Sequence, residues 1–200
     1  MNRPLSAIAP VTNHLPYMSS ETVSSLRGSL LLAAPLLTDP NFSRAVLYLA
    51  AHSQKDGAFG YILNRPLDKF VAELLPTEDM GRLARVPVFL GGPVSTDKLS
   101  FASLQWSNKR NTLKCQTHLS VDDALYELDM GHEVRAFVGY SGWSEGQLEG
   151  ELKLRSWITT SPQPILMTGE DITTLWEDIL KNMGPKYELL ASMPGKPELN

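Results

Sequence analysis

The sequence contains a single cysteine, Cys115, and lacks any apolar stretch long enough to cross a membrane as a helix. One cysteine cannot form an internal disulfide, so the sequence does not indicate an oxidising compartment. A membrane helix needs about 20 consecutive apolar residues. The apolar segment near the N-terminus is short and interrupted by proline, unlike a secretory signal. We therefore expect a cytoplasmic protein with no membrane contact.

An excess of basic residues is also lacking. The chain holds 18 Lys and Arg against 22 Asp and Glu, which gives a formal net charge of −4 at pH 7 with neutral histidines. Proteins that bind duplex DNA neutralise its phosphates with clustered cations. A small cluster of Lys109, Arg110 and Lys114 has Trp106 as its one nearby aromatic residue and predicts a solvated loop. Duplex DNA is therefore not an expected partner.

Spacings typical of metal ligands are missing as well. The four histidines, His14, His52, His118 and His132, stand apart from one another and from Cys115. A zinc site needs His and Cys ligands at short, recurring spacings. We therefore expect no metal site and no cofactor.

What the sequence does contain is an ordinary globular composition. Of its 200 residues, 42% are hydrophobic and 20% are charged, which is typical of one soluble domain. Prolines and a Ser/Thr run predict a flexible lead-in over residues 1–25. A single domain over residues 26–190 and a frayed tail over residues 191–200 complete the predicted organisation.

A series of short apolar runs has the length of β-strands. Asp56-Gly57 is a favoured hairpin turn, so the runs on either side of it predict a β-hairpin. The predicted strands cover residues 29–34, 45–52, 58–64, 86–90, 101–106, 113–117, 134–140 and 157–160.

Helices are predicted between these strands. Capping signals place helix starts at Ser120 and at Ser144, and Gly131 and Arg155 mark the corresponding ends. Helical spacing of apolar residues predicts a further helix over residues 68–75 and a last one from Thr168, which Gly184-Pro185 ends. Hairpins interspersed with helices predict the α+β class with a mixed sheet.

Four segments, in this order, resemble the AlgH/YqgE family of bacterial proteins. They are LLLAAPLLTDPNFSRAVLYLAAH (30–52), GAFGYILNRPL (57–67), FLGGPV (89–94) and FVGYSGWSEGQLEGEL (137–152). The resemblance implies an α+β fold with a mixed, bifurcated β-sheet, a small barrel-like part and surrounding helices. It also implies a cytosolic bacterial protein.

The resemblance supplies no firm activity, because this family is largely uncharacterised. One branch is named as a regulator of alginate synthesis genes, which implies transcriptional regulation. The sequence departs from the family pattern in a longer lead-in before Leu26, in residues 96–106, and at Ser141, where the family has alanine.

Polar and glycine residues at predicted strand ends are the candidate binding residues. An arginine after a strand offers a planar fork for a carboxylate or phosphate, and neighbouring glycines let backbone N–H groups approach an anion. We expect these residues to form one shallow pocket for a small anionic ligand or a protein partner. The set is His52, Asn64, Arg65, Gly91, Gly92, Trp143 and Glu149.

Each of these residues also has a structural interpretation. Arg65 could pair with an internal carboxylate and hold its loop, Asn64 could occupy a turn, and Glu149 could pair with Lys153. The Gly139-Tyr140-Ser141 sequence resembles a hydrolase nucleophile elbow. The elbow needs a small residue two places after the serine, and this chain has Trp143 there.

Three functions remain open from the sequence. The first is a ligand- or partner-binding regulatory module, including indirect transcriptional regulation. The second is an enzyme with an unrecognised active site, for which His52 is the first choice of general base. The third is a regulator that binds DNA directly. Catalytic residues cannot be assigned, because no acid–base pair or activated nucleophile is recognisable.

Overall fold

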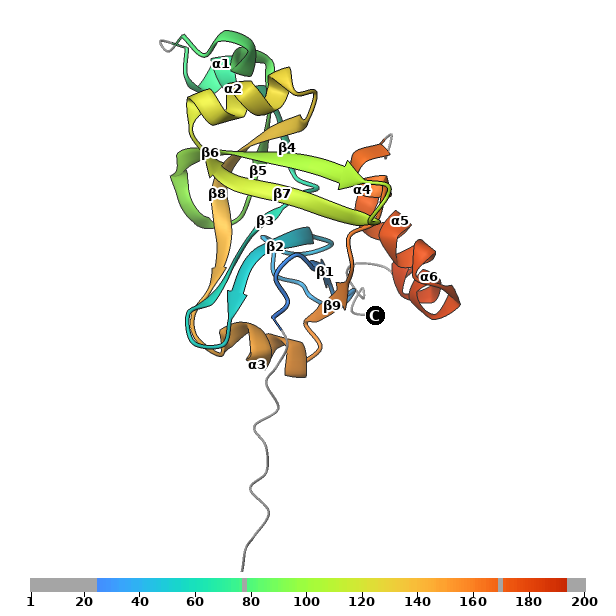
Figure 1. The fold of residues 1–200 in the computed structure, drawn as a ribbon. Coiled ribbons are helices and arrows are strands. Elements are labelled where there is room, and N and C mark those ends of the chain that lie inside the picture. The colour runs from blue at the N-terminus through green and yellow to red at the C-terminus, as the bar shows by residue number, and fades with distance from the viewer. Residues whose placement is uncertain (1–24, 77–78, 169–170, 194–200) are drawn as a thin grey trace, which may run out of the picture.

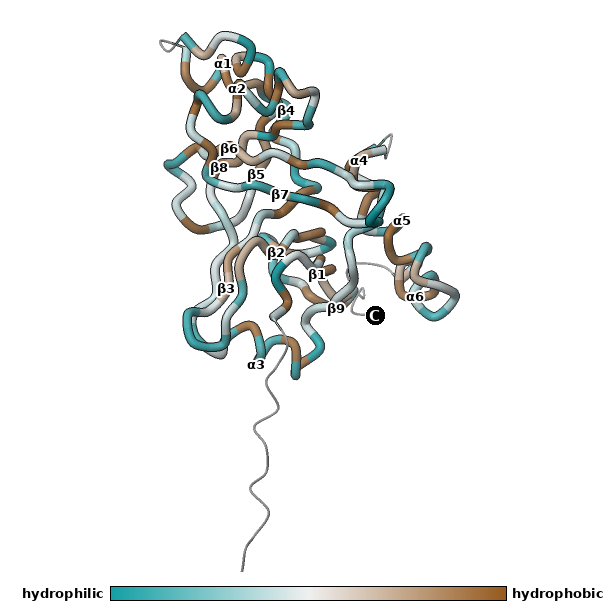
Figure 2. Tube along the Cα trace, in the orientation of Figure 1, coloured by the Kyte–Doolittle hydropathy of each residue, from teal (hydrophilic) through white to brown (hydrophobic). Residues whose placement is uncertain are grey.

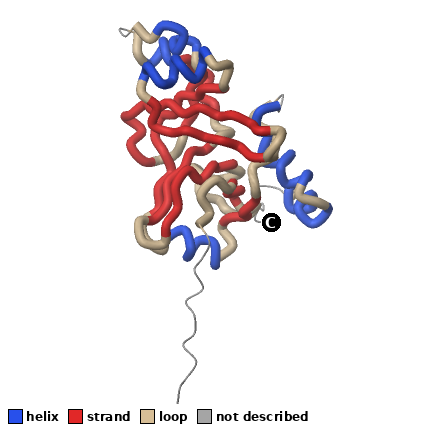
Figure 3. Tube along the Cα trace, viewed as in Figure 1, coloured by secondary structure: helices blue, strands red, loops and turns tan. Residues whose placement is uncertain are grey.

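The computed structural model describes residues 25–76, 79–168 and 171–193 (Figure 1). Residues 1–24 of the predicted lead-in and residues 194–200 of the predicted tail lie outside this range. Within it, the chain has the predicted α+β fold: a mixed sheet curls into a half-barrel, and helices lie around it (Figure 3).

The strands are β1 (Leu30–Ala33), β2 (Val46–Ser53), β3 (Gly57–Ile62), β4 (Pro66–Phe70), β5 (Pro87–Leu90), β6 (Val94–Ser107), β7 (Thr112–Leu119), β8 (Glu133–Trp143) and β9 (Trp157–Thr160). The helices are α1 (Val71–Leu74), the 3₁₀ helix η1 (Gly81–Arg85), α2 (Val121–Asp129), α3 (Gln147–Lys153), α4 (Ile165–Thr168), α5 (Leu175–Asn182) and α6 (Pro185–Ala191).

The sheet divides at β8, which is why it is bifurcated. The strand order is β4-β5-β8-β3-β2-β1-β9, and β6 pairs with both β8 and β7. The first part of β8 pairs with β5 in parallel and with β6 antiparallel, whereas residues 141–143 pair with β3. The long β6–β7 hairpin therefore curls away from the β1–β2–β3 part, as Figure 1 shows.

β1 forms because its apolar residues are covered on both faces. Leu30 and Leu32 face a core that also contains Trp176 of α5, whereas Leu31 and Ala33 face a second core on the α3 side. A continuous apolar run is the pattern expected of a strand that is buried on both faces. In Figure 2 the β2–β3 turn is hydrophilic, in contrast to the strands that it joins.

The predicted β2–β3 hairpin and the helix that begins at Ser120 are confirmed. β2 and β3 pair antiparallel, with His52 opposite Ala58. The Ser120 hydroxyl accepts the N–H of Asp123 at 3.1 Å, which is the expected N-cap of α2.

The helix predicted over residues 68–75 is wrong in its first turn. β4 runs to Phe70, and α1 begins only at Val71. Lys69 pairs with Val88 of β5, so pairing in the sheet overrides the helical spacing of the apolar residues.

The helix predicted to begin at Ser144 starts later. β8 continues to Trp143, past the predicted end at Tyr140, and Gly146 with a φ of 70° is the N-cap of α3. The Gln147 carboxamide oxygen still accepts the Ser144 N–H at 3.1 Å, as the capping signal predicts. A helix after Gly184 was not predicted, yet α6 begins there because proline suits a first helical turn.

Candidate functional site

His52 and Glu149 form a buried pair that joins β2 to α3. His52 Nδ1 accepts the backbone N–H of Leu26 at 3.0 Å, so Nε2 carries the proton and donates to Glu149 Oε1 at 3.0 Å. The His52 side chain is only 2% exposed. Both ring nitrogens are occupied, and this residue lines none of the cavities described below, so it does not have the access that a general base needs.

Trp143 lies near this pair but has a structural bond of its own. Its indole N–H donates to Glu151 Oε2 at 2.8 Å, and the Trp157 indole N–H donates to the same oxygen at 2.7 Å. The two indoles meet edge to face with ring centroids 6.0 Å apart. One carboxylate of α3 therefore fixes tryptophans from β8 and β9.

Gly91 and Gly92 lie where β8 passes very close to the chain after β5. A Cβ on Gly91 would lie 2.4 Å from the carbonyl oxygen of Gly139, and one on Gly92 would lie 2.3 Å from the backbone of Tyr140. Ser141 is fully buried, and its hydroxyl donates to the Gly91 carbonyl at 3.1 Å. The glycines thus permit a strand crossing, and Ser141 lacks the solvent access of a nucleophile.

Asn64 and Arg65 lie at the opposite end of β3 from His52. Asn64 is buried; its side chain accepts the Val46 N–H at 2.8 Å and donates to the Arg44 carbonyl at 2.9 Å. The Arg65 guanidinium donates to the Ser43 carbonyl. The structure therefore brings His52 close to Glu149, and Asn64 close to Arg65, but it does not unite the predicted residues in one pocket.

A groove that the sequence did not predict lies between β3, β7 and β8. Two cavities of about 580 and 360 Å³ adjoin there, because His118 and Tyr140 line both. Phe59 and Trp143 line the first cavity, and Tyr61 lines the second. We call these five residues the aromatic groove.

His118 reaches the groove because of an irregularity in the β6–β7 pairing. Phe101 pairs with Leu119 and Ala102 pairs with Thr117, so His118 is left without a partner across the ladder. Its φ is 56°, in the left-handed region. Such bulges redirect side chains, and unusual backbone at non-glycine residues is concentrated at functional sites.

The opposite wall of the groove is formed where the pairing of β6 with β8 is irregular. Between Val94 and Leu99, β6 advances five residues while β8 covers only the two from Tyr140 to Val138. The extra β6 residues bulge outward, and Ser95 has a φ of 52°. Ser95 and Lys98 line the smaller cavity, so the groove has a hydroxyl and a cation at this end.

The aromatic rings of the groove are stacked in a continuous cluster. The His118 and Phe59 rings lie nearly parallel with centroids 5.0 Å apart, and Tyr140 packs beside Phe59 at 5.3 Å. Tyr61 stacks on Phe137 at 4.4 Å behind them. His118 is exposed and Phe59 and Tyr140 are half-buried, so parts of the three rings that do not contact one another remain accessible to a planar ligand.

The floor of the groove is held by Tyr61. Its hydroxyl lies 2.9 Å from the Ser100 hydroxyl, and burial raises the pKa of Tyr61 above its ordinary value, while the bond to Ser100 lowers it to a smaller extent. The phenol is therefore neutral across the physiological range, and it supplies a fixed polar group beneath the rings.

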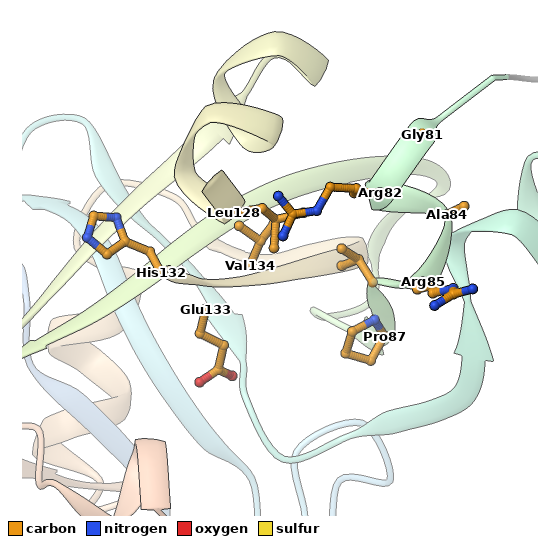
Figure 4. Close-up of a pocket in the computed structure, with 10 residues that line it drawn as sticks. Gly81, Arg82, Ala84, Arg85, Pro87, Leu128, His132, Glu133 and Val134 are labelled. Atoms are coloured by element: carbon orange, nitrogen blue, oxygen red, sulfur yellow. The ribbon is translucent and has the colours of Figure 1, made fainter. Parts of the chain in front are cut away.

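Another cavity, of about 650 Å³, lies between η1, α2 and the start of β8. Figure 4 shows that three of its polar side chains diverge: His132 and Arg85 lie at opposite sides and Glu133 points away from both. His132 bonds to Glu127 at 2.7 Å, and Glu133 bonds to Arg135 at 2.5 Å. Because His132 and Glu133 are already paired with neighbours, the cavity offers few converging groups to a ligand.

Among residues 25–76, 79–168 and 171–193, no three His, Cys, Asp or Glu side chains are grouped as a metal site would require. No helix in these ranges has the length and apolar character needed to cross a membrane.

The groove could not be predicted from local sequence patterns. His118 stands in an alternating strand, and nothing in the sequence around it marks a bulge. Phe59 and Tyr140 fall inside segments whose apolar character predicts core strands. Their convergence follows from the pairing of β3 with β8, which joins residues about 80 positions apart in the sequence.

Comparison with known proteins gives a consistent family. A sequence profile of the family described as AlgH-like matches residues 30–188. A protein of Streptomyces avermitilis named UPF0301 protein is 35% identical over 192 residues, which cover 89% of this chain and 97% of the relative. Another UPF0301 protein, from Parabacteroides distasonis, is 33% identical over 187 residues, covering 89% and 93%.

Two solved structures share the fold. The solution structure of the AlgH protein from Pseudomonas aeruginosa has a TM-score of 0.59 at 28% identity, and the match covers 90% of this chain and all of that one. A crystal structure of a protein from Corynebacterium diphtheriae has a TM-score of 0.62 at 21% identity, covering 83% and 91%. At that identity the second match shows the fold alone.

Proposed function

Within the AlgH-like family, to which this chain belongs, we propose that this protein is a ligand-binding regulatory module whose site is the aromatic groove. The observation that carries the proposal is the position of His118, which a β-bulge with a φ of 56° places over the ring of Phe59. The proposed ligand is a small planar molecule that stacks on these two rings.

The chemistry of the groove favours a planar ligand that carries an anionic group. Aromatic and imidazole faces bind flat conjugated rings, and such contacts contribute about 0.5–1.5 kcal/mol beyond the area that they bury. Lys98 and Ser95 line the far end, where a cation and a hydroxyl favour an acceptor group. A planar organic acid meets both requirements.

We test this proposal with a fluorescent probe, 8-anilinonaphthalene-1-sulfonate, and with benzoate, nicotinate and indole-3-acetate as competitors. Each combines a conjugated ring with one anionic group. The expected result is saturable binding that His118→Ala weakens about tenfold, because one stacking surface is lost. Arg110→Ala, a change at an exposed residue in the β6–β7 turn, is the matched control.

Absence of saturable binding by all four compounds would count against the proposal. Equal binding by the wild type and the His118→Ala variant would also contradict it, because the probe would then occupy another surface. Folding of each variant is checked by its amide NMR spectrum, since a collapsed spectrum would explain lost binding without any role in recognition.

The regulatory part of the proposal is indirect. The net charge of −4 disfavours contact with duplex DNA, so we propose that any effect on transcription passes through a protein partner whose affinity the ligand changes. Fluorescence anisotropy with labelled duplex DNA at low salt tests this part. Tight DNA binding that weakens steeply with added salt would favour the direct alternative instead.

A further inference from the structure

A further cavity, of about 510 Å³, lies at the end of β3 that is remote from His52, where the β1–β2 loop meets the segment before α5. It shares no lining residue with the aromatic groove. Its polar lining residues are Ser43, Arg44, Asn64, Arg65, Asp68 and Thr173, and we call it the arginine cavity.

The chain is held in an unusual conformation to form this cavity. Arg44 has a φ of 55°, in the left-handed region that non-glycine residues seldom adopt. The Asn64 carboxamide holds the chain just after this residue, because it bonds to the Arg44 carbonyl and to the N–H of Val46, on either side of Ala45. Asn64 is thus a positioning residue for Arg44.

Arg65 carries a buried donor that has no partner. Its guanidinium bonds to the Ser43 carbonyl, but among the described residues its Nε is a buried side-chain nitrogen with no hydrogen-bond partner. Within the same residues, the arginines that have a carboxylate within 4.0 Å are Arg44, Arg82 and Arg135. A buried donor on a permanently charged group is costly to leave unpaired.

The residues that line the cavity include two cations, Arg44 and Arg65, and one carboxylate, Asp68. Arg44 Nη1 donates to Glu177 Oε1 at 2.7 Å, and the Arg44 side chain remains 41% exposed. Asp68, with a φ of 52°, is the acidic residue of the lining and would oppose an anion. The Thr173 hydroxyl donates to Asp171 Oδ1 at 2.6 Å, and Asp171 itself does not line the cavity.

We propose that the arginine cavity binds a compact oxyanion, the carboxylate or phosphate group of a small molecule, with the Arg65 Nε–H as its first donor. A guanidinium fork matches two oxygens of either group, and the Arg44 charge lies on the same lining. The ligand would provide the acceptor that the buried Arg65 Nε lacks.

The direct test follows the Arg65 Nε–Hε signal by NMR during separate titrations with sodium phosphate and sodium succinate. Sodium chloride at equal ionic strength is the control. We expect a saturable shift of this signal with at least one oxyanion at or below about 10 mM, and no shift with chloride. The anion that saturates identifies whether phosphate or carboxylate is the preferred group.

No saturable shift with either oxyanion, or an equal shift with chloride, would overturn the proposal. Arg65→Lys keeps the charge but removes the fork, so we expect binding about tenfold weaker, as for the loss of one charge-assisted bond. Unchanged affinity in folded Arg65→Lys would also overturn it. Arg110→Ala, which changes an exposed arginine elsewhere, should bind like the wild type.

Asp68→Asn provides a variant in which Arg65 is retained. Removing the opposing charge should tighten oxyanion binding about threefold, and weaker binding would contradict the proposed location. Because this residue is exposed, the variant keeps the test decisive even where Arg65→Lys does not fold. Neither change touches the aromatic groove, so probe binding there should persist in both.

Discussion

The His118 imidazole stacks on the Phe59 ring with centroids 5.0 Å apart and an interplanar angle of 28°. The two residues come from β7 and β3, which are not paired with each other in the sheet. The contact exists because the bulge at His118 turns its side chain toward Phe59. A local backbone irregularity thus creates the face on which the proposed ligand stacks.

Because the backbone at His118 is left-handed, we expect two substitutions there to differ in their effect on stability. His118→Asn should leave the free energy of unfolding within about 0.5 kcal/mol, because asparagine tolerates this region, yet it removes the imidazole face. His118→Val should lose about 1–2 kcal/mol, since a β-branched residue is strained at this φ. Urea unfolding of both variants measures the difference. Equal stability of the two variants would contradict a backbone role for position 118.

The crossing of β8 over Gly92 predicts a large cost for a single methyl group. In Gly92→Ala the new Cβ would meet backbone of Tyr140 at 2.3 Å, so we expect a loss of about 3 kcal/mol or more in the free energy of unfolding. Gly131→Ala is the matched control, because its φ of 78° is also positive but nothing lies within 4 Å of the added atom.

For Gly131→Ala we expect a loss of only about 1 kcal/mol, from backbone strain alone. Urea midpoints for the two variants give the comparison. Equal losses would show that positive φ, and not the strand crossing, governs the glycine requirement at position 92.

Glu151 accepts hydrogen bonds from two tryptophans, so we expect its side chain to contribute strongly to stability. Glu151→Ala would leave the indole N–H groups of Trp143 and Trp157 without their acceptor, so we expect a loss of about 2–4 kcal/mol. The exposed Glu145→Ala should cost less than about 0.5 kcal/mol. Thermal unfolding followed by tryptophan fluorescence compares them, and similar losses for both changes would refute the bridging role.

Cys115 is predicted to be an unreactive thiol. Burial raises the pKa of Cys115 to about 12, and nearby Arg135 lowers it to a smaller extent. At pH 8 the thiolate is then on the order of a thousandfold rarer than in a cysteine with an ordinary pKa. Reaction with 5,5′-dithiobis(2-nitrobenzoate) should be slow in the native state and fast in urea. A native rate near that of free cysteine would contradict this environment.

Local signals were sufficient for much of the fold. The Asp56-Gly57 turn predicted the β2–β3 hairpin, and the pattern that starts at Ser120 predicted α2 with its cap, because each signal acts within a few residues. The mixed sheet followed from their arrangement. The same local rules failed at Phe70, where a strand partner distant in sequence decides the conformation.

The binding residues were harder to predict, because they depend on long-range pairing. The sequence predicted Arg65 as a binding residue, but that its Nε lacks a hydrogen-bond partner among the described residues is visible only in three dimensions. His52 has the polar character of a site residue, yet it is buried between Leu26 and Glu149. Polarity at a strand end therefore indicates that a side chain needs a partner, and does not tell whether that partner is a ligand.

The most direct test of the aromatic groove is an intermolecular NOE measurement on the complex with the tightest-binding planar acid. We expect NOEs from the ligand ring protons to the ring protons of both His118 and Phe59, and weaker NOEs to Phe59 at the same ligand concentration in His118→Asn. NOEs confined to other residues, with none to either ring, would contradict a ligand stacked in the groove.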